Sequence, residues 1–136
     1  MSVKNVRINN KKVGSDFEQK FCQYFHKKGF WAHFLNPAPD GSQPFDIILI
    51  RNGRAFAIDC KTVEGKSFPL DRIEPNQESA FKLMKECGNT ENYFALKISE
   101  TEIIMVPASY LLGMKRVLKS VKIDALKEKY GVINFE

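Results

Sequence analysis

Two apolar runs joined by an asparagine–glycine pair constrain the fold of this chain more than any other part of its sequence. The runs occupy residues 47–50 and 55–58, and Asn52-Gly53 lies between them. Asn-Gly is the preferred pair for a two-residue type I′ turn, whose twist matches that of antiparallel strands. Consecutive apolar residues are typical of central strands that helices cover on both faces. The pattern therefore predicts a buried β-hairpin with strands at residues 47–50 and 55–59.

Charged residues lie at the open end of this hairpin. Asp46 precedes the first run, and Asp59 and Lys61 end the second. Neighbouring strands are roughly 5 Å apart, so the two aspartates are expected to be close neighbours. Asp59 and Lys61 are two residues apart and point to the same face if the strand continues, whereas Cys60 points to the opposite side.

Two neighbouring carboxylates raise each other's pKa unless a cation lies between them. Their oxygens suit a hard divalent cation, Mg²⁺ or Mn²⁺. The sequence thus predicts a metal site at Asp46 and Asp59, with Lys61 placed to orient an attacking water or to stabilise developing phosphorane charge. The alternative is a structural ion pair of Lys61 with Asp59 or Asp46 at the end of a sheet.

A further carboxylate, Glu18, lies in a predicted helix upstream. The helix is expected to begin at Ser15 and to end before Gly29. Glu18 is three residues after Ser15, which is the spacing of a capping box. It can equally be a third carboxylate that reaches the metal from a helix packed on the sheet. The two interpretations stay open.

The rest of the chain alternates predicted helices and strands. Helices around a central mixed β-sheet define an α/β fold. The chain has 136 residues, which fits one domain. We place that domain at residues 14–136, behind a basic flexible arm at residues 1–13. The other predicted elements are strands at residues 30–35, 93–98 and 102–106, helices at residues 74–87, 107–120 and 124–130, and loops at residues 36–41 and 61–73.

Composition excludes several classes of protein. Hydrophobic residues make up 43% and charged residues 27%, a globular balance rather than a disordered one. No apolar run approaches the roughly 20 residues of a membrane span, and no secretory signal opens the sequence. Three widely spaced cysteines and two histidines argue against a disulfide framework and a zinc site. These features predict a cytoplasmic protein with reduced thiols.

Basic residues are clustered, and the net charge is +5. Such clusters predict a polyanionic partner, here nucleic acid, although a solvated surface that serves solubility is the alternative. Contacts of this kind hold the DNA backbone rather than read its sequence. The candidate DNA contacts are Lys4, Arg7, Lys11, Lys12, Lys66, Lys115, Arg116 and Lys119.

The hairpin carries a motif of a known family. Pro44-Phe45-Asp46, followed by Asp59-Cys60-Lys61, resembles the motif of the PD-(D/E)xK nuclease superfamily. Further along, Phe68-Pro69-Leu70, Ile73 and Gln77 are similar to a segment of RecU-type Holliday junction resolvases of Gram-positive bacteria and their phages. The resemblance covers residues 14–85. Two features depart from it, since those resolvases more often carry Glu at position 59 and have a stalk where this chain has a tight turn.

The resemblance implies a restriction-endonuclease-like core and a Mg²⁺- or Mn²⁺-dependent endonuclease that hydrolyses phosphodiesters with an activated water. It implies that Asp46, Asp59 and the backbone carbonyl of Cys60 bind the metal and that Lys61 is the catalytic lysine. It further implies Glu18 as an auxiliary acid and metal ligand, and Gln77 as a residue near the site. For Gln77 the alternative is a polar surface residue in the first turn of a helix.

A four-way DNA junction is the substrate that the resemblance favours. A junction is nearly two-fold symmetric, so paired cuts call for a homodimer. Dimer contacts are expected at Phe21 and Phe25 or at Leu111-Leu112, all of which can instead be core residues. Two other functions remain open, namely a repair or restriction-type endonuclease on duplex or flap DNA and a non-catalytic DNA-binding module of the same fold.

Overall fold

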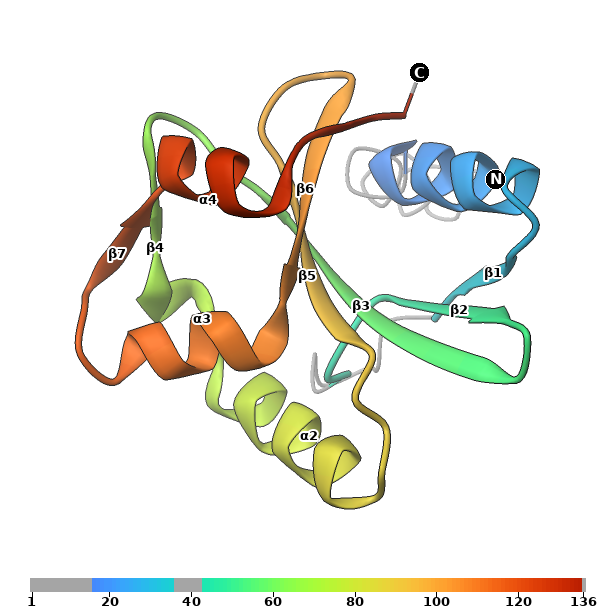
Figure 1. Cartoon of the computed structure of the whole chain (residues 1–136), viewed down its shortest axis with the longest axis horizontal. Helices are drawn as coiled ribbons and strands as arrows, with labels where there is room; N and C mark the ends of the chain where they lie inside the picture. The colour runs from blue at the N-terminus through green and yellow to red at the C-terminus, as the bar shows by residue number, and fades with distance from the viewer. Residues whose placement is uncertain (1–15, 36–42, 136) are drawn as a thin grey trace, which may run out of the picture.

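The computed structural model of the chain describes residues 16–35 and 43–135. Helices flank a strongly twisted central sheet (Figure 1), which confirms the predicted α/β fold. None of the described helices is long and apolar enough to cross a membrane. After a helix at residues 16–27, the elements are β1 (Trp31–Phe34), β2 (Ile47–Arg51), β3 (Arg54–Thr62), β4 (Ser67–Pro69), the 3₁₀-helix η1 (Leu70–Arg72), α2 (Pro75–Glu86), β5 (Asn92–Lys97), β6 (Glu102–Pro107), α3 (Ala108–Lys115), β7 (Ser120–Lys122), α4 (Ile123–Tyr130) and β8 (Ile133–Asn134).

The central sheet has six strands in the order β1-β2-β3-β5-β6-β8. β3 and β5 are parallel, and the other neighbouring pairs are antiparallel, so the sheet is mixed as predicted. β4 and β7 form a separate two-stranded antiparallel sheet. In this order β3 is an inner strand, which places the residues at its end within the body of the protein.

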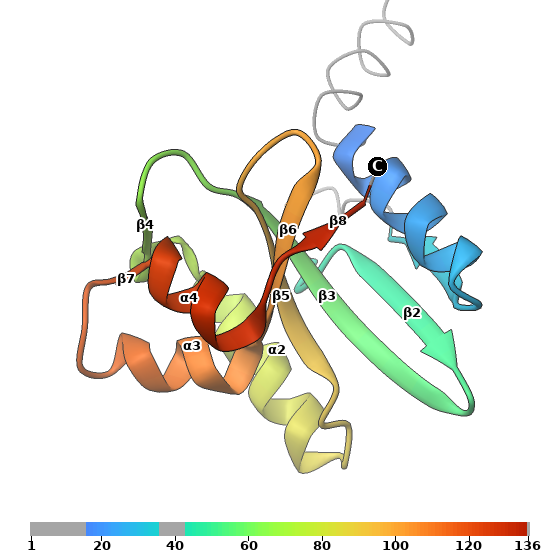
Figure 2. The ribbon, with the colours of Figure 1, turned by 45° about the horizontal axis from the view of Figure 1, so that its top comes forward.

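The β2–β3 hairpin has the predicted turn. The strands pair from Ile47 opposite Ile58 to Arg51 opposite Arg54. Asn52 and Gly53 have φ angles of 52° and 73°, and a type I′ turn requires positive φ at both central residues. Figure 2 shows β2 and β3 as long neighbouring strands that meet at this turn. β3 continues through Cys60, so the alternation expected for Asp59 and Lys61 holds.

The two faces of the sheet carry separate hydrophobic cores. One core, with Phe81, Phe94 and Leu111, lies beneath α2, α3 and α4. The other, with Phe21 and Ile58, lies beneath the helix at residues 16–27. This arrangement explains why β3 is apolar at consecutive positions, whereas on β2 only Ile47 and Leu49 are buried and Ile50 is 40% exposed. Phe21 and Leu111 are 0% exposed, so these two residues are core and the prediction that they make dimer contacts is wrong.

The helix at residues 16–27 ends where predicted. Gly29 has a φ of +93°, and its backbone N–H donates to the carbonyl of His26 at 3.0 Å. A left-handed glycine is the common C-terminal stop of a helix. Three other predictions lie outside the described residues, namely the cap Ser15, the arm at residues 1–13 and the loop at residues 36–41.

Two predicted segments differ from the structure. Residues 61–73, predicted as a loop, include the end of β3, all of β4 and η1. The helix predicted over residues 107–120 ends at Lys115, and its last predicted residue begins β7. Both errors have one cause, because β4 and β7 pair with Phe68 opposite Val121. This contact joins segments far apart in the sequence and overrides their local pattern.

Candidate active site

The two aspartates meet at the open end of the hairpin. Asp46 lies one residue before β2, and its backbone N–H donates to the carbonyl of Ile58 at 2.9 Å. Its side-chain Oδ2 accepts a hydrogen bond from the backbone N–H of Cys60 at 2.8 Å. The carboxylate of Asp46 is therefore fixed beside β3 at the residue that follows Asp59.

Asp59, Lys61 and Gln77 form a closed polar triangle on the face of β3 that α2 covers. The ammonium Nζ of Lys61 lies 3.1 Å from Oδ2 of Asp59 and donates to Oε1 of Gln77 at 3.1 Å. Nε2 of Gln77 donates to Oδ1 of Asp59 at 2.9 Å. Asp59 is 2% exposed and Gln77 is 6% exposed, so solvent screens these contacts little.

The start of α2 holds Gln77 in this position. Glu74 is the N-cap, Pro75 is the first helical residue, and Gln77 is the third. Oε1 of Gln77 accepts from the backbone N–H of Glu74 at 3.1 Å as well as from Lys61. Because that oxygen receives two donors, the amide nitrogen faces Asp59. Glu74 was not predicted as the cap, because the capping-box signature has Ser, Thr, Asp or Asn at that position; Pro75 at the first helical residue and Gln77 at the third are the signals that the sequence does carry.

The environment of Asp59 disfavours its charged form. Burial, and after it the neighbouring Asp46, raise the pKa of Asp59 to about 7, although Lys61 acts in the opposite direction. Oδ2 of Asp59 is buried and lies 3.1 Å from the ammonium of Lys61. A buried carboxylate next to a second carboxylate is a feature that a further cation would stabilise.

The donor set fits a magnesium-like ion. Asp46 and Asp59 supply carboxylate oxygens, and the backbone carbonyl of Cys60, the residue directly after Asp59, is the further candidate ligand. Mg²⁺ keeps several waters and usually takes only one or two protein carboxylates. Across residues 16–35 and 43–135, no group of three or more acidic, histidine or cysteine side chains is gathered closely enough to enclose a metal. The site therefore fits an open, partly hydrated metal ion and not an all-protein cage.

Glu18 faces the sheet from the helix at residues 16–27. Burial, and after it the charge of Asp46, raise the pKa of Glu18 to about 7. Burial also raises the pKa of the Cys60 thiol, and Asp46 and Glu18 add to this effect. Glu18 and Asp46 thus both lie near the half-buried Cys60. Because Ser15 is outside the described residues, the capping interpretation of Glu18 is not tested, and its role as auxiliary acid stays a prediction.

The predicted DNA contacts differ in how free their charges are. Lys66, Arg116 and Lys119 are exposed. Lys115 is half-buried, where it donates to the carbonyl of Ile73 at 3.0 Å and lies 3.4 Å from a carboxylate oxygen of Glu78. Lys115 therefore ties α3 to the start of α2. The other candidates, which lie outside the described residues, are Lys4, Arg7, Lys11 and Lys12.

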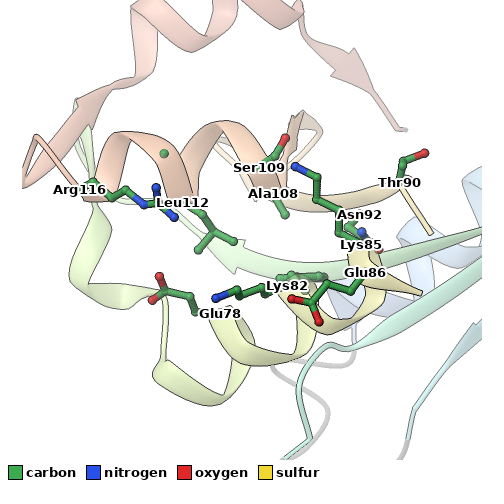
Figure 3. A pocket seen from close by; sticks show the side chains of 12 residues that line it. Glu78, Lys82, Lys85, Glu86, Thr90, Asn92, Ala108, Ser109, Leu112 and Arg116 are labelled. Carbon is green, nitrogen blue, oxygen red and sulfur yellow. The ribbon is translucent and has the colours of Figure 1, made fainter. Parts of the chain in front are cut away.

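A groove of about 670 Å³ lies between α2 and α3 and is separate from the carboxylates (Figure 3). Lys82, Lys85 and Arg116 line it together with Glu78 and Glu86, so its charges are mixed. None of the five candidate catalytic residues lines this groove. The groove is therefore not the candidate active site.

Two carboxylates and a lysine at the paired ends of β2 and β3, on a mixed sheet flanked by helices, match the arrangement expected from the resemblance to PD-(D/E)xK nucleases. The chain belongs to the family described as archaeal Holliday junction resolvase (Hjc), which it matches over residues 9–131. This family consists of structure-specific DNA endonucleases that resolve Holliday junctions, and the prediction of an endonuclease is confirmed at this level.

A solved structure supports the fold. The chain is similar to a Holliday junction resolvase, Hjc, from the archaeal hyperthermophile Archaeoglobus fulgidus, with a TM-score of 0.63 and 21% sequence identity. The match covers 85% of this chain and 93% of that chain. The restriction-endonuclease-like core is thereby confirmed. A search of curated proteins found no match.

The family match supports the predicted superfamily but not the predicted subgroup. It supports the nuclease superfamily and a resolvase family, but it is to archaeal resolvases and gives no support to a RecU-type, Gram-positive or phage subgroup. This chain has the tight Asn52-Gly53 turn where RecU-type enzymes carry a stalk. Because the chain nevertheless belongs to a resolvase family, the absence of a stalk at this turn does not argue against a resolvase.

Proposed function

We propose that this chain is a Mg²⁺-dependent endonuclease that resolves four-way DNA junctions, with Mn²⁺ able to replace Mg²⁺. The observation that carries the proposal is the polar triangle of Asp59, Lys61 and Gln77 beside the carboxylate of Asp46. Membership of a Holliday junction resolvase family supports the choice of substrate.

Each residue of the cluster has a distinct role in this proposal. Asp46, Asp59 and the carbonyl of Cys60 bind the metal, which would supply an activated water and neutralise charge on the reacting phosphodiester. Lys61 binds and orients that water, or stabilises the charge that develops on the phosphate. Gln77 positions Lys61 and Asp59, because it contacts both through one amide. Glu18 is an auxiliary acid that acts on Asp46 from the helix at residues 16–27.

We further propose that the protein acts as a homodimer in the cytoplasm. Two symmetric cuts in a junction need two active sites related by a two-fold axis. All three cysteines are free, which agrees with a reducing compartment. The RecU-like run that ends at Gln77 remains a hypothesis about subgroup, supported only by that local motif.

A panel of labelled DNA substrates tests the proposal. Wild-type protein is incubated with a four-way junction, a linear duplex of the same sequences and a flap, each with Mg²⁺ and with a chelator. If the proposal is right, the junction is cut at paired positions with Mg²⁺ and is not cut with the chelator. Preferential cutting of duplex or flap supports a repair or restriction-type enzyme instead. Binding that falls steeply with salt, without cutting of any substrate, supports a non-catalytic module.

Glu18→Gln separates the two interpretations of Glu18. Glutamine serves as well as glutamate in a capping box, so the helix is kept. The substitution removes the partly buried carboxylate beside Asp46, and we expect the rate of junction cleavage to fall by roughly tenfold or more. The melting temperature should be unchanged or higher, because burial disfavours the carboxylate. Unchanged cleavage would contradict the auxiliary acid and leave only the helix cap.

Gln77→Ala is expected to impair both stability and cleavage. It removes the donor to buried Asp59, and a lost partner of a buried polar group costs about 1–3 kcal/mol of unfolding free energy. Loss of the amide that positions Lys61 should slow single-turnover cleavage by roughly 10–100-fold. Ser79→Ala, at an exposed site on the same helix, is the matched control. A normal cleavage rate in Gln77→Ala would contradict the positioning role.

A further inference from the structure

Trp31 is exposed on the edge strand of the central sheet. It is 55% exposed, and Ile50, directly opposite on β2, is 40% exposed. The rings of Trp31 and His33 are stacked, with centroids 5.5 Å apart and an interplanar angle of 14°. His33 is also exposed. The chain thus presents two nearly parallel flat rings to solvent at one end of its sheet.

These rings lie on the same face of the sheet as Asp59 and Lys61. Trp31 pairs with Ile50, which pairs with Ala55 on β3, and residues directly opposite in antiparallel strands share a face. Alternation along β3 then puts Asp59 and Lys61 on that face as well. Phe30 and Ala32, on either side of Trp31, pack instead against the core beneath the helix at residues 16–27.

The separation suits a single DNA molecule that contacts both places. Asp59 is four residues beyond Ala55, roughly 13 Å along β3, and β1 is two strand spacings, roughly 10 Å, from β3. These components give a distance of roughly 16 Å across the face. One DNA strand rises about 3.4 Å per nucleotide along the helix axis, so that distance spans about five nucleotides.

The exposed area is too small for a stable dimer interface but suits one or two bases. A whole aromatic side chain covers about 150–250 Å², so the exposed parts of Trp31 and Ile50 together amount to less than roughly 300 Å². A stable interface takes about 800 Å² from each partner. In Figure 1 the helix at residues 16–27 lies on one side of β1 and β2, and in the described part no helix covers the other side.

We propose that Trp31, supported by His33 and Ile50, stacks on a base of the DNA substrate that is exposed at or near the branch point. Aromatic side chains stack on bases of any sequence because every base has a flat π-face. This inference rests on the proposed function for its substrate, and it adds a substrate-positioning residue outside the metal site. Trp31 would hold the DNA in register with the site at Asp59 and Lys61, which lie on the same face of the sheet.

Fluorescence gives a direct test, since Trp31 is the only tryptophan in the chain. Protein in metal-free buffer is titrated with a four-way junction, an oligothymidylate strand and a blunt duplex. Stacking predicts quenching of the tryptophan emission by the junction and the single strand, and weaker quenching by the duplex. No change in emission while anisotropy of labelled DNA shows saturated binding would overturn the proposal.

Substitutions separate stacking from other roles. Trp31→Ala should weaken binding of the junction by roughly tenfold, whereas Trp31→Phe, which keeps a ring, should stay within about threefold of wild type. Leu83→Ala, at a 60% exposed position on α2, is the matched control and should bind as wild type does. Equal binding by Trp31→Ala and wild type would contradict stacking. A shift from dimer to monomer in Trp31→Ala without DNA would show instead that this face contacts a second copy.

The result is distinguishable from a failure of the proposed function. Both readouts measure binding without metal, so they do not depend on cleavage. Quenching by junction DNA together with no cleavage of any substrate would overturn the nuclease and keep the stacking residue. Normal junction cleavage with silent Trp31 fluorescence would overturn the stacking residue alone.

Discussion

Replacement of Lys61 by methionine is expected to slow single-turnover cleavage of a four-way junction by about a hundredfold to a thousandfold. Methionine keeps much of the aliphatic length and removes the ammonium group. That group lies 3.1 Å from Asp59 and donates to Gln77, so it is held where it can reach a reacting phosphate or water. Junction affinity in a chelator should change little, because a single charge near the cleaved bond adds little to binding along the whole DNA backbone.

The matched control is Lys127→Met, which removes the charge of an exposed lysine on α4. Its cleavage rate should equal that of wild type. If Lys61→Met cleaves as fast as wild type, Lys61 is only an ion-pair partner of Asp59. If Lys61→Met loses junction binding and cleavage to the same extent, the lysine is a DNA contact and not a part of the chemistry.

Asp59→Asn is expected to remove cleavage and, in metal-free buffer near neutral pH, to stabilise the fold. The structure raises the pKa of Asp59 from 3.8 to about 7 through burial and the neighbouring Asp46. Between these pH values the folded protein holds a proton that the unfolded chain has released. Stability from this group therefore falls as the pH rises from about 4 to about 7 and is constant above that range.

The difference in unfolding free energy between Asp59→Asn and wild type should thus grow with pH over this window. Each unit of pKa shift corresponds to about 1.4 kcal/mol, so the difference should reach a few kcal/mol at most. Urea unfolding at a series of pH values measures it. A difference that stays constant from pH 4 to pH 8 would contradict the raised pKa of Asp59.

Mg²⁺ should reverse the effect in wild type. A cation between Asp46 and Asp59 relieves their repulsion, so Mg²⁺ should raise the melting temperature of wild type at pH 8 and leave that of Asp59→Asn unchanged. Loss of a metal ligand should reduce cleavage by more than the roughly 10–100-fold that loss of a supporting partner causes. Equal stabilisation of both proteins by Mg²⁺ would place the metal elsewhere.

The hairpin and the meeting of its two aspartates could be predicted from the sequence because their causes are local. The Asn52-Gly53 turn sets the pairing of the strands. That pairing then brings the residue before β2 next to the end of β3. The apolar positions on both faces of β2 and β3 likewise indicated helices on both sides of the sheet.

The contacts that complete the site could not be predicted in this way. From the sequence, Gln77 could be either a site residue or a surface residue, because its contact with Asp59 depends on how α2 packs against β3. β4 and β7 were missed for the same physical reason, since each strand exists only through the other. Nothing in the sequence indicated that Trp31 is a candidate DNA contact, because its exposure and the face that it shares with Asp59 follow from the register of three strands.

The central claim is that Asp46, Asp59 and Lys61 form a metal-dependent site for junction cleavage. Its most direct test is the single-turnover rate of junction cleavage by wild type across a range of Mg²⁺ concentrations, compared with calorimetric binding of Mg²⁺ to the same protein. We predict that rate and binding saturate together, and that both are lost in Asp59→Asn. Full-rate cleavage in a chelator, or undiminished cleavage by Asp59→Asn, would contradict the claim.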